Sequence, residues 1–182
     1  MSRNYKFHDP AGLYFISFAT VQWVDIFTRR EYKDIVVDSL RYCQEHKGLL
    51  LYAWCIMSNH VHLFVEAAEG KQLPAIVRDL KKFTAGTILK AIEQHPGESR
   101  KEWILDIFRK AGAANASNTT YQFWQHDNHP IQIWSPAVIE QKLAYLHDNP
   151  VVEGYVEHAE DYVYSSAATF AGKPGLLKLE PL

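Results

Sequence analysis

The spacing of apolar residues changes twice within the first 48 positions, and each pattern predicts an element. Residues 13–21 are an aromatic and β-branched run after an Asp-Pro-Ala-Gly turn, which predicts a first strand. Apolar residues then recur at helical spacing from Ile35 to Cys43. We expect this helix to begin with a capping box at 28–31 and to end at Gly48.

A hairpin and a second helix are predicted next. The continuous apolar run 49–57, a Ser-Asn turn and the alternating segment 61–65 predict two antiparallel strands. An apolar stripe from Leu73 to Ile88, with Phe83 among its members, then predicts a helix. The order so far is strand, helix, strand, strand, helix.

The second half of the chain is less regular. We expect a loop or insertion at about 97–120 with one short helical piece, and then strand-like residues at 121–134 that turn residues interrupt. Ser135 and Pro136 predict the start of a third helix, which Pro150 should end. A C-terminal extension follows after about residue 165.

Together these elements predict a single domain over residues 1–182 with an α+β fold. One further strand completes the β-α-β-β-α-β order of a ferredoxin-like, two-layer sandwich. In that fold an antiparallel sheet carries helices on one face and leaves the other face available for a site.

Composition narrows the class of protein. The chain is 47% hydrophobic, which is enough for a real core, and no apolar run approaches the roughly 18 residues of a membrane-spanning helix. Cys43 and Cys55 have no metal-type or redox-type spacing, so we expect reduced, buried thiols in a cytoplasmic protein. The net charge of −2 means that nucleic-acid binding would need a local basic patch.

Two histidines lie in the predicted third strand, in the sequence Ser-Asn-His-Val-His. Residues two apart in a strand point to the same side, so His60, His62 and Phe64 share the face opposite the apolar one. Two imidazoles placed in this way could bind one cation. The alternative is that both histidines are ordinary polar residues of a strand.

The third predicted helix adds a nucleophile. Tyr145 and Asn149 are four residues apart and therefore share a helix face, beside the apolar stripe. A tyrosine hydroxyl can attack phosphorus, a metal would polarise the phosphoryl oxygen, and an amide oxygen could be a third ligand. In the alternative, Tyr145 is an ordinary edge residue and Asn149 ends the helix before Pro150.

Three separated motifs, in this order, resemble those of one family: MSNHVHLFVE around the histidine pair, YLHDNP with its Tyr-x-x-x-Asn spacing, and DYVYSSAA. They are similar to the IS200-like single-tyrosine transposases, and most of all to the REP-associated tyrosine transposases, over about residues 14–169. The resemblance implies an HUH endonuclease fold with His60 and His62 as metal ligands and Tyr145 as the nucleophile. Asn149 takes the third-ligand place, where insertion-sequence members usually carry Gln.

The activity implied by this resemblance is cleavage and rejoining of single-stranded DNA by a metal-dependent endonuclease and strand transferase. Tyr145 would form a 5′-phosphotyrosine and release a 3′-hydroxyl, and a second 3′-hydroxyl could rejoin the strand. The expected cofactor is Mg²⁺ or Mn²⁺. The expected partner is single-stranded DNA with hairpin or palindromic ends, and both a monomer and a homodimer stay open.

The second predicted helix carries a basic cluster in the segment RDLKKFTAGT, which also resembles the family. Arg78, Lys81 and Lys82 lie opposite the apolar stripe of that helix. We expect them to bind DNA, with Lys81 and Lys82 on phosphates. The alternative is a solvated helix face with no ligand.

Two other classes of function are open to the sequence. Nucleotide hydrolases of the histidine-triad type also carry alternating strand histidines, but here the third position is Phe64. A domesticated relative that binds DNA hairpins without transposition is the second alternative. The presence of His60, His62, Tyr145 and Asn149 argues against it.

Overall fold

The structure is a computed structural model that describes residues 7, 9, 12–114 and 120–182. In chain order its strands and helices are β1 Tyr14–Ala19, α1 Arg30–His46, β2 Leu49–Ile56, β3 His60–Ala67, α2 Leu73–Gln94, α3 Lys101–Ala113, β4 Ile131–Gln132, α4 Pro136–Val152 and α5 Ala167–Phe170. Short 3₁₀ helices occur at Val21–Trp23, Ile26–Thr28 and Ala159–Asp161.

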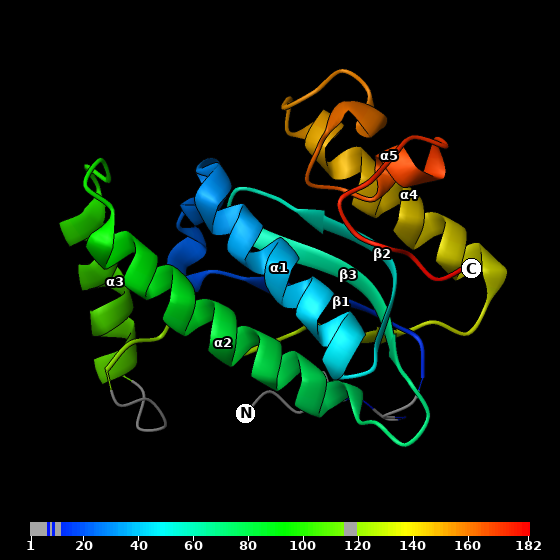
Figure 1. The fold of residues 1–182 in the computed structure, drawn as a ribbon, viewed down its shortest axis with the longest axis horizontal. Coiled ribbons are helices and arrows are strands. Elements are labelled where there is room, and N and C mark those ends of the chain that lie inside the picture. The colour runs from blue at the N-terminus through cyan, green and yellow to red at the C-terminus, as the bar shows by residue number, and fades with distance from the viewer. Residues whose placement is uncertain (1–6, 8, 10–11, 115–119) are drawn as a thin grey trace.

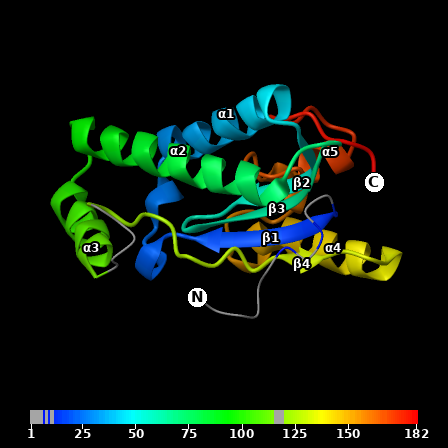
Figure 2. The same ribbon diagram turned by 90° about the horizontal axis from the view of Figure 1, so that it is seen from below.

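The strands of the described chain form one antiparallel sheet in the order β2-β3-β1-β4. Figure 1 labels the first three of these strands, and Figure 2 labels β4 as well. The long strand β3 lies between β2 and β1, and its pairing with β1 runs from Val65 opposite Tyr14 to His60 opposite Ala19. This is the strand order of the ferredoxin-like fold, so the predicted β-α-β-β-α-β arrangement is confirmed.

Helices cover both faces of the sheet, whereas the prediction placed them on one face only. Figure 2 shows α1 and α2 on one side of the strands and α4 on the other. The expectation of helices on one face therefore holds for α1 and α2 but not for α4. The physical reason is that both faces are apolar: Phe15 and Phe64 are buried on the α4 side, while Ile16 and Leu63 are buried on the side of α1 and α2.

The capping box predicted for the first helix is wrong. The residue before α1 is Arg29, with no side-chain cap, and the Thr28 hydroxyl donates to the carbonyl oxygen of Asp25 within the preceding 3₁₀ helix. Arg29 is instead held by Glu98, whose carboxylate lies 2.8 Å from its Nε. The predicted end is correct, because Gly48 follows with a left-handed φ of 75°.

Three further features differ from expectation. Phe83, placed in the buried stripe of α2, is 63% exposed. The expected insertion is largely helical, since α3 occupies residues 101–113, and residues 115–119 lie outside the described chain. The segment 121–134 contains only the two-residue strand β4 and an isolated bridge from Trp124, because the turn residues between them break the pairing.

The third predicted helix begins where the sequence indicates. The Ser135 hydroxyl accepts a hydrogen bond from the backbone N–H of Val138, which is an N-cap. Pro150 does not end α4, which continues for two more residues to Val152, because a proline in the last turn removes only one helical hydrogen bond.

The C-terminal extension packs along the edge of the sheet. Ser165 forms an isolated antiparallel β-bridge with Cys55 of β2, and the backbone N–H of Glu180 donates to the carbonyl oxygen of Leu51. Both cysteines are buried and free, as expected. Among the described residues, no helix is long and apolar enough to cross a membrane.

Candidate active site

The residues predicted from two distant motifs meet between β3 and α4. The rings of His60 and His62 have centroids 4.6 Å apart, and Nδ2 of Asn149 lies 3.0 Å from Nε2 of His62. The ring of Tyr145 packs edge-on against His62, with centroids 5.3 Å apart. The structure therefore brings all four residues together, at a separation of more than 80 residues in sequence.

Local geometry explains this convergence. His60 and His62 alternate with Val61 and Leu63 along β3, so both imidazoles face α4 while the aliphatic side chains face α1 and α2. On α4 the four-residue spacing places Tyr145 and Asn149 on the same side of the helix. Phe15 of β1 completes the floor of the site, stacked on His62 at 5.4 Å.

Both histidines are neutral in this setting. Burial lowers the pKa of His60 to about 4. Burial, with smaller contributions from His60 and Lys142, lowers the pKa of His62 to about 3. Neutral imidazoles have a free lone pair at neutral pH, which is the form in which histidine binds metals.

The hydrogen bonds of His60 leave one ring nitrogen for a ligand. Its Nδ1 lies 2.7 Å from Oδ1 of Asn59, which can only accept, so the proton is on Nδ1 and the lone pair on Nε2. The amide of Asn59 is oriented in turn, because its Nδ2 donates to the carbonyl of Trp23 and to Oδ1 of Asp25. A carboxylate, an amide and an imidazole in series are typical of the residues that orient a metal ligand.

His62 and Asn149 fit a cation site in a second way. Nδ2 of Asn149 donates to the Nε2 lone pair of His62 at 3.0 Å. Two ligands of one small divalent cation also lie about 3 Å apart when each bond is about 2.1 Å, so turning the amide to put its oxygen in this place would make it a ligand. Nδ1 of His62 is the single buried side-chain nitrogen or oxygen in the described chain without a hydrogen-bond partner. No third His, Cys, Asp or Glu joins the pair among the described residues, so the third protein donor would be the Asn149 amide.

Lys142 is a site residue that the sequence reasoning missed. Its Nζ lies 5.8 Å from the ring centroid of Tyr145 and 5.4 Å from that of Phe15. The sequence spacing could have indicated it, because Lys142 is three residues before Tyr145 and so shares its helix face. The tyrosine itself is about half exposed, so its hydroxyl is accessible to a large substrate beside a positive charge.

The predicted DNA-binding residues of α2 do not join this site. Arg78 is exposed and contacts Asp79, and Lys82 is exposed. Both belong to the helix layer on the other side of the sheet from α4 (Figure 2). The Lys81 ammonium donates to Gln125 O at 2.9 Å and to Asn128 Oδ1 at 2.6 Å, which ties α2 to the loop before β4. DNA binding by these three residues stays a prediction.

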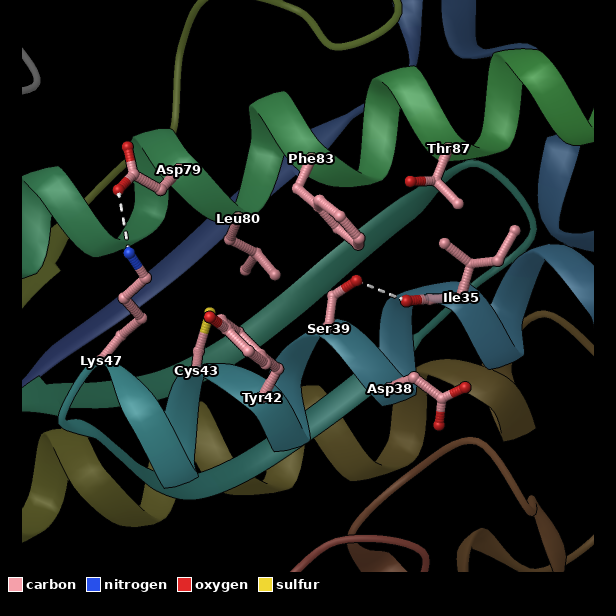
Figure 3. Close-up of a pocket in the computed structure, with 10 residues that line it drawn as sticks. All are labelled: Ile35, Asp38, Ser39, Tyr42, Cys43, Lys47, Asp79, Leu80, Phe83 and Thr87. Carbon is pink, nitrogen blue, oxygen red and sulfur yellow. Dashed lines mark hydrogen bonds and ion pairs between the residues drawn. The ribbon is translucent and has the colours of Figure 1, made fainter.

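One cavity lies apart from the site. It is a groove of about 590 Å³ between α1 and α2, with the exposed rings of Tyr42 and Phe83 over it (Figure 3). A smaller cavity of about 190 Å³ adjoins His60. His147 lines neither of these two cavities, and its Nε2 lies 2.8 Å from the hydroxyl of Ser166.

Comparison with known proteins assigns the class. The sequence model of the IS200-like transposase family matches residues 14–105, which is half of the chain, and this chain belongs to that family. The match includes both histidines and ends before Tyr145. Proteins described as REP-associated tyrosine transposases are among those similar to this chain.

One such relative is a Haemophilus influenzae protein described, provisionally, as a REP-associated tyrosine transposase. It is 28% identical over 123 residues, which are 67% of this chain and 61% of that protein. The chain therefore matches less than two thirds of that relative's length. A solved REP-associated tyrosine transposase bound to a REP hairpin shares the fold, with a TM-score of 0.63 and 14% identity over 100% of this chain and 93% of the other.

Proposed function

We propose that this chain is a single-stranded DNA transposase that cleaves and rejoins DNA through a covalent bond to Tyr145. The observation that carries the proposal is the convergence of two neutral histidines, an amide and an accessible tyrosine at one place between β3 and α4. Membership of the IS200-like family supports the same conclusion.

In the proposed reaction, the hydroxyl oxygen of Tyr145 attacks the phosphorus of a DNA phosphodiester. A bond forms between the tyrosine oxygen and phosphorus, the bond from phosphorus to the 3′ oxygen breaks, and the leaving strand takes up a proton as a free 3′-hydroxyl. The 5′ end stays on the protein. A different 3′-hydroxyl can then attack the phosphotyrosine, which restores the tyrosine and joins the strands without ATP.

His60, His62 and Asn149 would hold a divalent cation, which we propose to be Mg²⁺ or Mn²⁺. When bound, such a cation polarises the phosphoryl oxygen and orients the phosphate. The chain's own groups perform the other tasks. Lys142 places a positive charge beside the tyrosine, where negative charge develops on the phosphate. Asn59 accepts the Nδ1 proton of His60, so the lone pair of His60 is on Nε2, the ring nitrogen that does not face Asn59.

The proposed partner is single-stranded DNA that carries a hairpin. Support comes from the relative that shares the fold, whose structure contains a REP hairpin. A hairpin-binding protein without cleavage activity is the alternative, and the orientation of His60 by Asn59 and Asp25 favours the enzyme, because binding DNA alone does not require oriented metal ligands.

The test is formation of a covalent adduct. The protein is incubated with oligonucleotides that have palindromic ends and Mn²⁺, and the products are separated in denaturant. We expect a slower-migrating protein–DNA species with wild type and none with Tyr145→Phe. Tyr42→Phe, on the other side of the sheet, is the matched control and should behave as wild type.

Metal binding is measured separately by titrating the protein with Mn²⁺ in a calorimeter. His60→Ala and His62→Ala should abolish binding, while His46→Ala, an exposed histidine of α1, should not change it. An adduct that forms equally with wild type and Tyr145→Phe would refute the nucleophile. Binding of Mn²⁺ that survives both histidine variants would refute the metal site.

A further inference from the structure

The cavity beside His60 extends the candidate site by one helical turn. It measures about 190 Å³ and lies between the turn before β3 and the residues that follow α4. Trp23, Asn59 and His60 line one side of it, and Glu153 and Tyr155 line the other. The cavity therefore opens directly next to the nitrogen ligands proposed to hold the cation.

Two exposed aromatic side chains flank this cavity. Trp23 is 57% exposed and meets the ring of His60 edge-on, with centroids 5.9 Å apart. Tyr155 is 45% exposed and is braced from behind by the buried Tyr162, onto which it stacks at 6.0 Å. Flat, partly exposed rings of this kind offer surfaces on which an unpaired base can stack.

Trp23 is presented by a strained backbone. Gln22 and Trp23 both have left-handed φ angles, 53° and 56°, in a region that bulky residues rarely adopt. The turn is held by a hydrogen bond from the Trp23 N–H to Thr20 and by one from Asn59 to the Trp23 carbonyl. The Trp23 ring is mostly exposed, so packing of the ring within the protein does little to offset the strain. A strained backbone that holds an exposed ring in place points to a ligand-binding role for the side chain.

The far wall of the cavity is connected to the nucleophile through α4. Tyr145 and Asn149 lie four residues apart on α4, and Glu153, the C-cap residue four positions later, has a helical conformation and continues their row. Asn149 meets His62, and Glu153, one turn later, lines the cavity with His60. A DNA strand whose phosphate lies at the histidine pair would thus place a neighbouring nucleotide at Glu153.

We propose that this cavity binds one unpaired base of the DNA strand, adjacent to the phosphate that Tyr145 attacks. Trp23 provides the stacking surface, and the Glu153 carboxylate accepts hydrogen bonds from the edge of the base. Guanine is the best match, because its two adjacent N–H donors face both oxygens of a carboxylate, whereas thymine offers a single donor between two acceptors. This inference rests on the proposed function, since it assumes that single-stranded DNA occupies the site.

The test uses Tyr145→Phe protein, which cannot form the covalent bond, and a pool of single-stranded 12-mers of random sequence. Bound oligonucleotides are recovered and sequenced after several rounds. We expect guanine to be enriched at one position. With Glu153→Gln this preference should fall by about tenfold, because an amide keeps only one acceptor oxygen. Glu45→Gln, an exposed glutamate of α1, is the matched control.

The role of Trp23 is tested by the affinity for one enriched oligonucleotide, measured by fluorescence anisotropy. Trp23→Asn should weaken binding by about tenfold, whereas Trp23→Phe, which keeps an aromatic ring, should retain most of the affinity. Asparagine tolerates the left-handed conformation, so the variant should unfold at the wild-type temperature. Tyr42→Ala removes an equally exposed ring on the other side of the sheet and should bind as the parent does.

The outcomes separate this inference from the proposed function. If an adduct forms on Tyr145 but neither Trp23→Asn nor Glu153→Gln changes binding or preference, the base site is refuted and the chemistry stands. If no adduct forms but both variants act as expected, the base site stands and the proposed chemistry fails. If the protein binds no oligonucleotide of the pool but forms the adduct with palindromic ends, the base site is refuted and the chemistry stands.

Discussion

Buried, neutral His62 should make the metal-free protein sensitive to acid, and replacing it should remove a defined part of that sensitivity. His62 is 3% exposed, and its folded-state pKa is about 3, against 6.5 in the unfolded chain. Because the folded pKa is lowered, the unfolded chain takes up more protons as the pH falls below 6.5. The stability associated with neutral His62 is therefore fully present above pH 6.5 and is lost as the pH falls toward 3.

The magnitude follows from the difference between the two pKa values. At pH 5 the unfolded imidazole is almost fully protonated and the folded one is almost fully neutral. The gap of about 1.5 pH units below the unfolded pKa corresponds to about 2 kcal/mol, at 1.36 kcal/mol per unit. At pH 7.5 the contribution is close to zero. The figure at pH 5 is the same whether the folded pKa is 3 or 4, because both values lie well below 5.

The assay is urea denaturation followed by circular dichroism at pH 7.5 and pH 5, with EDTA present. Between the two pH values, His62→Phe should lose about 2 kcal/mol less stability than wild type. For a urea slope of about 2 kcal/mol per molar, this appears as a difference of about 1 M between the midpoint shifts. Phenylalanine keeps an aromatic ring on Phe15, and the comparison of pH dependences cancels any constant packing change.

His46→Phe is the control, because His46 lies exposed on α1 and its replacement should leave the pH dependence unchanged. Equal losses of stability in wild type and His62→Phe would refute the reasoning. That result would mean that His62 accepts its proton in the folded state as easily as in the unfolded chain, and so is not held as a neutral, buried imidazole.

Three further predictions concern the parts that support the site. Ser135→Ala removes the N-cap of α4 and should cost about 1 kcal/mol, visible in thermal unfolding as a decrease of a few degrees. Asn59→Ala frees the ring of His60 and should weaken Mn²⁺ binding in calorimetry by about 10- to 100-fold. Lys142→Met keeps the aliphatic stem but removes the charge beside Tyr145, and should slow adduct formation by about tenfold or more in a quenched time course; an unchanged rate would exclude an electrostatic role.

Much of the fold was accessible from local sequence. Alternation in β3 and the apolar run in β2 predicted the central hairpin, and helical spacing predicted α1, α2 and α4. The predictions failed where contacts between residues far apart in the chain do what a local sequence motif was expected to do. Arg29 is held at the start of α1 by Glu98, 69 residues away, so no capping box is needed there. The segment before β4 looked like a strand from its aromatic content, but Phe123 and Trp124 are buried as core side chains of a loop.

The site was predictable in part, because some of its geometry depends only on spacing within one strand or one helix. The spacing of His60 and His62 and that of Tyr145 and Asn149 each place two side chains on one face of one element, which is a local property. Lys142 shares the face of Tyr145 but was missed, since a lysine on an amphipathic helix is usually only solvated. Trp23 gave no signal at all, because its left-handed backbone depends on contacts with Thr20 and Asn59.

The sequence by itself determined which residues could act together within an element, because periodicity along a strand or helix decides which side chains share a face. Only the tertiary structure decided that α4 crosses the sheet on the side opposite α1 and α2, which brings Asn149 to 3.0 Å from His62. It also decided that Lys81 contacts the loop before β4, that His62 is buried, and that both imidazoles are neutral. Packing of elements and desolvation depend on residues far apart in the chain, and no local pattern encodes them.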